Sequence, residues 1–92
     1  MRKSKFRQLE NRFFVLQKAE ESIDIQNYDE YSKIWDEYTN LLNEWSFFDY
    51  IFANKEESEL IDRISRARRT ITKRFEEENK QFKEWGERLL LF

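Results

Sequence analysis

The stretch YDEYSKIWDEYTNLLNEW, residues 28–45, decides the fold class. Its large apolar residues recur at alternating intervals of three and four, the heptad spacing that aligns side chains along one face of an α-helix. Asn27, followed three residues later by Glu30, has the residue types of a helix N-cap and capping box. The stretch therefore predicts an amphipathic helix that begins near residue 28. Its apolar face consists of Tyr28, Tyr31, Trp35, Tyr38, Leu42 and Trp45.

Similar spacings predict a helix on each side of this stretch. One covers residues 4–22 and the other residues 55–85, where Asn54 and Glu57 provide a second candidate capping pair. Short connections make consecutive helices antiparallel neighbours. We therefore expect an all-α fold in a single domain over residues 1–92. It would be a three-helix bundle or an extended antiparallel helical hairpin with a longer third helix.

The run WSFFDYIF, residues 45–52, carries apolar side chains on every side of a helix. The middle helix, expected over residues 28–52, therefore either becomes fully buried there or breaks near Ser46. The run could form a core contact at the turn between the second and third helices. It could also form an exposed patch, because aromatic residues supply much of the binding energy at protein interfaces. The residues of this run that we assign to a candidate protein interface are Trp45, Phe47, Phe48 and Phe52.

The third predicted helix is longer than the second, so its C-terminal end should extend past its neighbour. That end, with the apolar tail 86–92, would expose a large apolar patch, which is unusual on a monomer. We expect a second copy of the chain, giving a homodimer, or another protein to cover it. The alternative is a tail that folds back onto its own core. The interface residues assigned here are Phe82, Trp85, Leu89, Leu90 and Phe92.

The composition excludes several classes of function. The 92 residues include no His, no Cys, no Pro and one Gly. Ser-His-Asp and Cys-His catalysis, Cys-ligated zinc, disulfides and glycine-rich phosphate loops are therefore excluded within this chain. The sequence has no apolar run of membrane-spanning length, and we expect no signal peptide. We expect a cytoplasmic protein with no cofactor, no metal and no membrane partner.

Charge is segregated along the chain. Residues 1–19 carry six basic groups and one acid, residues 20–62 two basic groups and thirteen acids, and residues 63–92 nine basic groups and five acids. Pairing between the helices explains much of this pattern, at a small gain in free energy per pair. Basic side chains along one face could instead contact nucleic-acid phosphates. The residues assigned to that alternative are Arg2, Lys3, Lys5, Arg63, Arg66, Arg69, Lys73 and Arg74.

The middle helix carries an acidic face opposite its apolar one. Glu30, Glu37 and Glu44 recur every seven residues, about 10.5 Å apart along a helix. Such a face could capture a basic partner by mimicking nucleic acid, or it could be an ordinary solvated helix surface. The other acids of this face are Asp29 and Asp36.

One pattern of acids concerns metal chemistry. Glu20-Glu21-x-x-Asp24 and Glu59-x-x-Asp62 place carboxylates three residues apart on two helices, where they could hold Mg²⁺. The arrangement resembles the EExxE and ExxD motifs of the MazG-type nucleotide pyrophosphatases, with Asp24 where that pattern has Glu. The resemblance covers only these stretches and would imply magnesium-dependent nucleotide hydrolysis. Helix capping and salt bridges account for the same acids, and we expect no enzymatic activity.

These patterns together favour a non-enzymatic protein–protein interaction module, such as an adaptor, an inhibitor or an assembly component. Its apolar residues would provide the affinity, and the charges around them would select the partner. Nucleic-acid binding through the third helix and the basic N-terminal residues is the alternative. Mimicry of nucleic acid by the acidic face is a lesser one.

Overall fold

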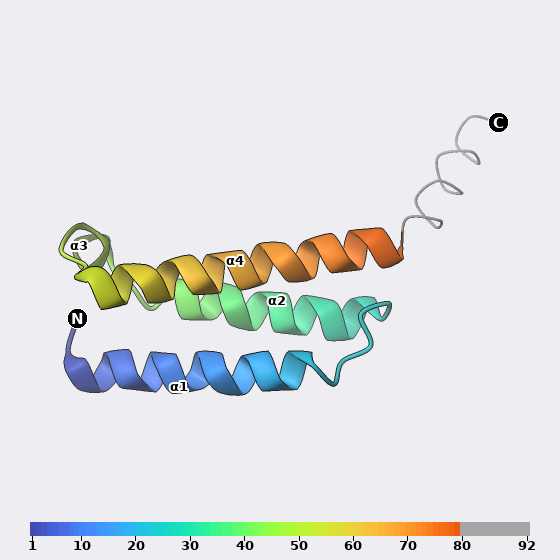
Figure 1. Ribbon diagram of the computed structural model, residues 1–92, viewed down its shortest axis with the longest axis horizontal. Coiled ribbons are helices and arrows are strands. Elements are labelled where there is room, and N and C mark those ends of the chain that lie inside the picture. Colours follow the sequence, from blue (N-terminus) through green and yellow to red (C-terminus); the bar gives the residue numbers. More distant parts are fainter. Residues whose placement is uncertain (80–92) are drawn as a thin grey trace, which may run out of the picture.

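The computed structural model describes residues 1–79, which form α1 (Lys3–Glu20), α2 (Tyr28–Leu42), α3 (Phe47–Ile51) and α4 (Lys55–Glu78). These residues contain no β-strand, so the described part of the chain is all-α, as predicted. Figure 1 shows α1, α2 and α4 side by side along the long axis of the molecule. The short α3 lies at the end where α1 and α4 begin.

Side-chain caps start α2 and α4 where the sequence predicts. The Asn27 side chain accepts hydrogen bonds from first-turn backbone N–H groups, including that of Glu30 at 3.3 Å. The Asn54 side chain accepts one from Glu57 N–H at 2.8 Å. Both predicted N-caps are therefore confirmed. The Glu30 carboxylate does not bond back to its cap, because it accepts the backbone N–H of Asp24 at 2.7 Å.

The middle helix is not continuous over residues 28–52. It ends at Leu42, and the chain becomes extended at Ser46, where ψ is 170°. The Ser46 hydroxyl accepts the Asp49 N–H at 3.2 Å, and the Asp49 carboxylate accepts the Ser46 N–H at 2.9 Å. This capping box satisfies the backbone groups of a new helix start, which explains why the helix breaks here.

Two other helix ends differ from the predicted bounds. α1 ends at Glu20 rather than residue 22, because the hydroxyl and backbone N–H of Ser22 both bond to the carbonyl of Ala19. α4 ends at Glu78. Residues 80–85 of the predicted third helix, and the tail 86–92, lie outside the described residues.

One hydrophobic core joins the three long helices. α2 packs against both α1 and α4, whereas α1 and α4 contact each other less. None of the helices within residues 1–79 is long and apolar enough to cross a membrane. The buried apolar side chains are Leu9, Phe13, Ile34, Tyr38, Leu41, Leu42, Trp45, Leu60, Ile64 and Ile71.

Candidate protein interface

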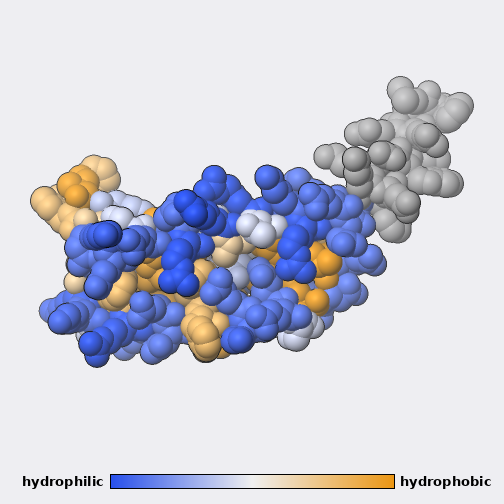
Figure 2. Space-filling model, in the orientation of Figure 1, coloured by the Kyte–Doolittle hydropathy of each residue, from blue (hydrophilic) through white to orange (hydrophobic). Residues whose placement is uncertain are grey.

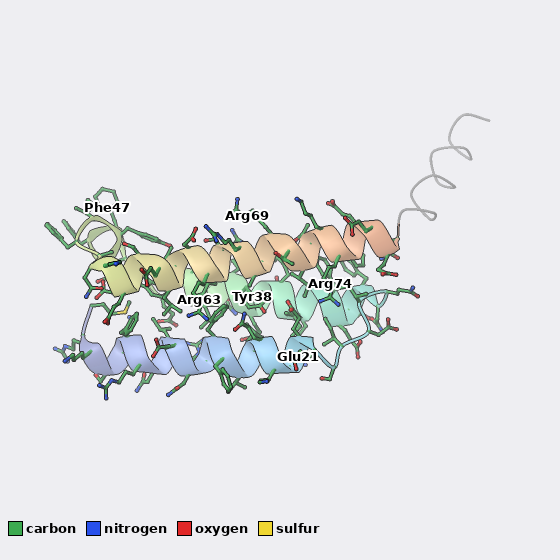
Figure 3. The ribbon with its side chains drawn as sticks, in the orientation of Figure 1. Glu21, Tyr38, Phe47, Arg63, Arg69 and Arg74 are labelled. Atoms are coloured by element: carbon green, nitrogen blue, oxygen red, sulfur yellow. The ribbon has the colours of Figure 1, made fainter. Side chains whose placement is uncertain are left out.

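The short helix α3 and the residue after it carry a cluster of exposed apolar side chains. We call this cluster the α3 knob, and it consists of Phe47, Phe48, Ile51 and Phe52, which are 73%, 68%, 55% and 77% exposed. Figure 2 shows the cluster as an orange projection at the α3 end of the molecule. Figure 3 shows Phe47 on the outside of α3, away from the three long helices. The knob therefore faces solvent.

Polar contacts, rather than burial, hold α3 in place. α3 has no buried residue of its own. The capping box joins Ser46 to Asp49, and the Tyr50 hydroxyl donates a hydrogen bond to the Leu42 carbonyl at 3.1 Å. The Met1 α-amino group lies 3.6 Å from Asp49 Oδ1. Hydrogen bonds from Ser46, aided by this amino group, hold the pKa of the Asp49 carboxyl below its usual value.

The α3 knob is comparable in area to the largest apolar patch of a typical monomeric protein. At roughly 200 Å² per fully exposed aromatic side chain, its three phenylalanines and Ile51 leave about 500 Å² of apolar surface in water. The largest apolar patch on a typical monomer is about 300–600 Å², and such patches are often functional. The knob therefore has the size and composition of a binding surface.

Trp45, which we predicted to be an interface residue together with the knob phenylalanines, lies in the core instead. Its side chain is only 4% exposed, and its indole Nε1 has no hydrogen-bond partner among residues 1–79. The helix break at Ser46 separates Trp45, which packs in the core, from the exposed phenylalanines of the α3 knob. Glu57, at the start of α4, is also buried, and its Oε1 lies 3.7 Å from the Met1 amino group.

A second apolar surface lies between α1 and α2. We call it the α1–α2 groove, and it has a volume of about 460 Å³. Val15 is largely exposed beside it. Helical spacing places Val15 beside the row formed by Leu9, Phe13 and Leu16 on α1, and not within it. The groove is lined by Asn11, Arg12, Val15, Leu16, Ala19, Glu37 and Leu41.

The basic residues assigned to nucleic-acid binding do not share one face. Arg69 points away from the other helices, whereas Arg63 and Arg74 point toward α1 (Figure 3). The Arg63 guanidinium lies 5.7 Å from the centre of the Phe13 ring, and Arg74 Nη1 lies 3.8 Å from the Glu20 carboxylate. Helical spacing places Arg66 and Lys73 on the outer face with Arg69.

The N-terminal basic residues also meet acids. Lys5 Nζ lies 3.7 Å from a Glu44 carboxylate oxygen. Lys3 lines a groove between α1 and α4 that contains three basic and three acidic residues, and Arg2 precedes α1 as its N-cap residue. The groove residues are Lys3, Phe6, Arg7, Glu10, Glu56, Glu59, Leu60 and Arg63.

Part of the predicted acidic face is used inside the fold, and Glu44 lies just after the end of α2. Glu44 contacts Lys5 and also Arg12, whose Nη1 lies 3.5 Å away. The Glu30 carboxylate accepts a hydrogen bond from the backbone N–H of Asp24, in the connection before α2. Asp29, Asp36 and Glu37 are exposed. Pairing of Glu44 with Lys5 and Arg12 therefore explains some of the charge segregation, and the four acids of α2 itself lie on its surface.

The acids of the predicted magnesium pattern have other partners. Glu20 accepts a hydrogen bond from the buried Tyr38 hydroxyl at 3.2 Å, and Asp62 lies 3.0 Å from Arg66. Burial of Tyr38, and then the Glu20 charge, raise the pKa of the phenol. Glu21 lies at the C-terminal end of α1 (Figure 3). The described residues contain no group of three or more acidic side chains that could hold a metal ion.

The remaining predicted interface residues lie outside the described part of the chain. They are Phe82, Trp85, Leu89, Leu90 and Phe92. Comparison with known proteins adds no assignment: no family model, no curated protein and no solved structure matches the chain. The α3 knob is thus the predicted interface region whose geometry the structure describes.

Proposed function

We propose that the protein is a non-enzymatic protein–protein interaction module that binds its partner through the α3 knob. It would act as an adaptor, an inhibitor or an assembly component. One observation carries the proposal: four large apolar side chains face water on α3 and the residue after it, although polar contacts anchor this helix and it buries none of its own residues. A helix that served the core would bury its apolar face.

The anchoring of α3 also favours binding. Side chains presented by a preorganised helix lose less conformational entropy on association than side chains on an unstructured loop. Aromatic side chains are enriched among the residues that dominate interface energies. We propose that the knob phenylalanines supply the affinity, and that the charged residues around α3 select the partner's orientation.

The finer architecture belongs to the same proposal. We infer that the three long helices act as a three-helix bundle, and that the protein forms a homodimer in the cytoplasm. The shared core of α1, α2 and α4 supports the bundle. The small size of the domain supports association, because a chain of 92 residues buries a modest share of its surface alone.

Nucleic-acid binding is the second candidate. The observation that favours it is a row of exposed basic side chains on the outer face of α4, spaced at intervals of three and four. They are Arg66, Arg69 and Lys73. Arg63 and Arg74, which we also assigned to nucleic-acid binding, point toward α1, so the basic side chains of α4 are divided between two faces. Capture of a basic partner by the exposed acids of α2 is a lesser candidate.

A pull-down from native cell lysate, with and without nuclease, tests these candidates. The baits are the full chain, the knob variant Phe48→Ser/Phe52→Ser, and the control Phe14→Ser, which removes a 60% exposed phenylalanine from α1. We expect a stoichiometric protein, which can be a second copy of the chain, to bind the full chain and the control. The knob variant should lose it, and nuclease should not. Nuclease-sensitive capture that the knob variant retains would instead support nucleic-acid binding.

A further inference from the structure

A hollow on the surface between α2 and α4 gathers basic side chains around an indole ring. We call it the α2–α4 hollow, and it has a volume of about 240 Å³. The residues that line it are Trp35, Arg68, Arg69, Thr72 and Lys73. Three of these side chains are cationic and none is acidic. The hollow therefore has the charge of an anion-binding site.

Contacts with α2 hold the Arg68 side chain in this hollow. Arg68 is half-buried, and its guanidinium carbon lies 5.3 Å from the centre of the Trp35 ring. Its Nη1 donates a hydrogen bond to Thr39 Oγ1 at 3.1 Å, the one side-chain hydrogen bond that Arg68 makes within residues 1–79. A guanidinium has five N–H donors. Most of these donors therefore remain available to a ligand, and the side chain is in position before the ligand binds.

None of the three cations has an acidic partner in the part of the chain that the structure describes. The basic residues of α4 that form ion pairs there are Arg66 and Arg74. Arg69 and Lys73 are four residues apart, and like charges at this spacing destabilise a helix. A bound anion would offset that repulsion. Phosphate is well suited, because its oxygens accept several charge-assisted hydrogen bonds at once.

The wall formed by Trp35 and Arg68 indicates a ligand that also carries an aromatic ring. Nucleobases stack on indole rings and on guanidinium planes. An apolar cavity of about 150 Å³ can hold a benzene molecule, so a hollow of about 240 Å³ has room for one ring and part of what is attached to it. An acidic peptide could satisfy the charges, but its carboxylates would make no use of the stacking surface. A nucleoside phosphate would use both features.

The basic surface is short, which favours a free nucleotide over a nucleic-acid strand. Along the outer face of α4, exposed basic side chains extend from Arg66 to Lys73, about 10 Å of helix. The exposed acids Asp62 and Glu76 lie on either side of them. Proteins that bind single strands use a basic groove that follows the backbone over about 4–16 nucleotides. A strand would meet carboxylates at both ends of this surface, whereas one nucleotide fits between them.

We propose that the α2–α4 hollow binds a free nucleoside phosphate. Arg69 and Lys73 bind the phosphates, and the base stacks against the pair formed by Arg68 and Trp35. This role goes beyond the proposed function and uses no residue of the α3 knob. The hollow begins thirteen residues beyond Lys55, or about 20 Å along α4, so a partner protein and a nucleotide can occupy the same molecule.

NMR titrations of the ¹⁵N-labelled full chain in metal-free buffer test the inference. The probes are ATP, adenosine, which has the ring without phosphates, and tripolyphosphate, which has phosphates without the ring. The site variant is Arg69→Gln/Lys73→Gln. The matched control, Arg7→Gln/Lys18→Gln, removes one Arg and one Lys from exposed positions of α1 that do not line the hollow. All four side chains are exposed, so both variants should melt within about 3 °C of the full chain.

We expect ATP to shift the indole N–H signal of Trp35, assigned with Trp35→Phe, and the amide signals of residues 68–73, with a dissociation constant below about 1 mM. Adenosine and tripolyphosphate should each bind at least about 10-fold more weakly, because each lacks one of the two contacts. The site variant should bind ATP at least about 10-fold more weakly, and the control within about 2-fold of the full chain. The knob variant Phe48→Ser/Phe52→Ser should bind ATP as the full chain does.

Four results would overturn the inference. One is the absence of shifts in the hollow at about 10 mM ATP, where even weak binding is detectable. Another is tripolyphosphate that binds as tightly as ATP, because only charge would then be recognised. The third is a site variant that binds ATP as well as the control does. The fourth is tighter binding at the hollow by an oligothymidylate of about 12 nucleotides or by polyglutamate, which would assign the hollow to a strand or to an acidic protein. None of these results concerns protein capture by the knob, so the proposed function is tested separately by the pull-down.

Discussion

Replacing Ser46 with alanine should release α3 while leaving the core intact. The substitution removes the hydroxyl that accepts the Asp49 N–H and that donates to the Asp49 carboxylate at 3.0 Å. Loss of a Ser N-cap typically costs about 1 kcal/mol. α3 buries none of its residues, so little apolar contact compensates for the loss. We therefore expect the free energy of opening α3 to fall by about 1 kcal/mol, which raises its open population about 5-fold.

Amide hydrogen exchange measures this opening residue by residue. The Tyr50 N–H bonds to the Ser46 carbonyl at 3.1 Å, and the Phe52 N–H bonds to the Phe48 carbonyl at 2.9 Å. Both amides should exchange about 5-fold faster in the alanine variant. Amides beside the buried Ile64 of α4 should keep their protection, because they open only when the whole domain unfolds.

Two outcomes would refute this reasoning. If exchange in α3 is unchanged, the capping box does not hold the helix. If α4 loses protection by the same factor as α3, then α3 unfolds together with the whole domain, and it does not open as a separate helix held by polar contacts. Ser58→Ala, which removes an exposed serine within α4, is a matched control and should change neither region.

Three further measurements concern the core and the ionisable groups. Ile64→Ala removes a fully buried side chain and should lower the free energy of unfolding by about 2–5 kcal/mol, or the melting temperature by at least about 10 °C in a thermal melt. Tyr38→Phe removes the hydrogen bond to Glu20 and should cost about 1 kcal/mol at pH 7. Because the folded state raises the Tyr38 pKa, the unfolded phenol ionises first and the native protein loses stability as pH rises above 10.0. Urea titrations at pH 9 and pH 11 should therefore show the advantage over the Phe variant shrinking. Asp49 behaves in the opposite sense: its folded pKa is lowered, so its contribution is present above pH 3.8 and is lost as pH falls below that value. Asp49→Asn should remove this acid-dependent loss of amide protection in α3, whereas an unchanged pH dependence would assign it to another group.

The heptad spacing of residues 28–45 and the caps at Asn27 and Asn54 were readable from the sequence alone. Both depend on interactions within a few residues of the same helix, so local sequence is enough to specify them. The all-α class was readable in the same way, whereas the aromatic run left the break near Ser46 as one of two alternatives. The capping box that makes the break is itself a local contact between Ser46 and Asp49.

The burial of the aromatic run was decided only in three dimensions. Trp45 and Phe47 are both large and apolar and only two residues apart, yet one lies in the core and the other in water. The difference comes from the direction that the chain takes after Ser46, which the contacts of Tyr50 with Leu42 and of Asp49 with the Met1 amino group determine. Those contacts join residues that are too far apart in the sequence for a local pattern to predict them.

The division of the charged residues also required the tertiary structure. By spacing alone, Arg63 and Arg69 belong to one basic stripe. Because α1 lies against only one side of α4, the Arg63 guanidinium lies near the Phe13 ring, whereas Arg69 faces solvent. The α1–α2 groove has the same origin, because its walls come from two helices. A sequence specifies which side chains a helix presents along each face. Which of those faces meets another helix, and which remains exposed for a partner, depends on how the helices pack.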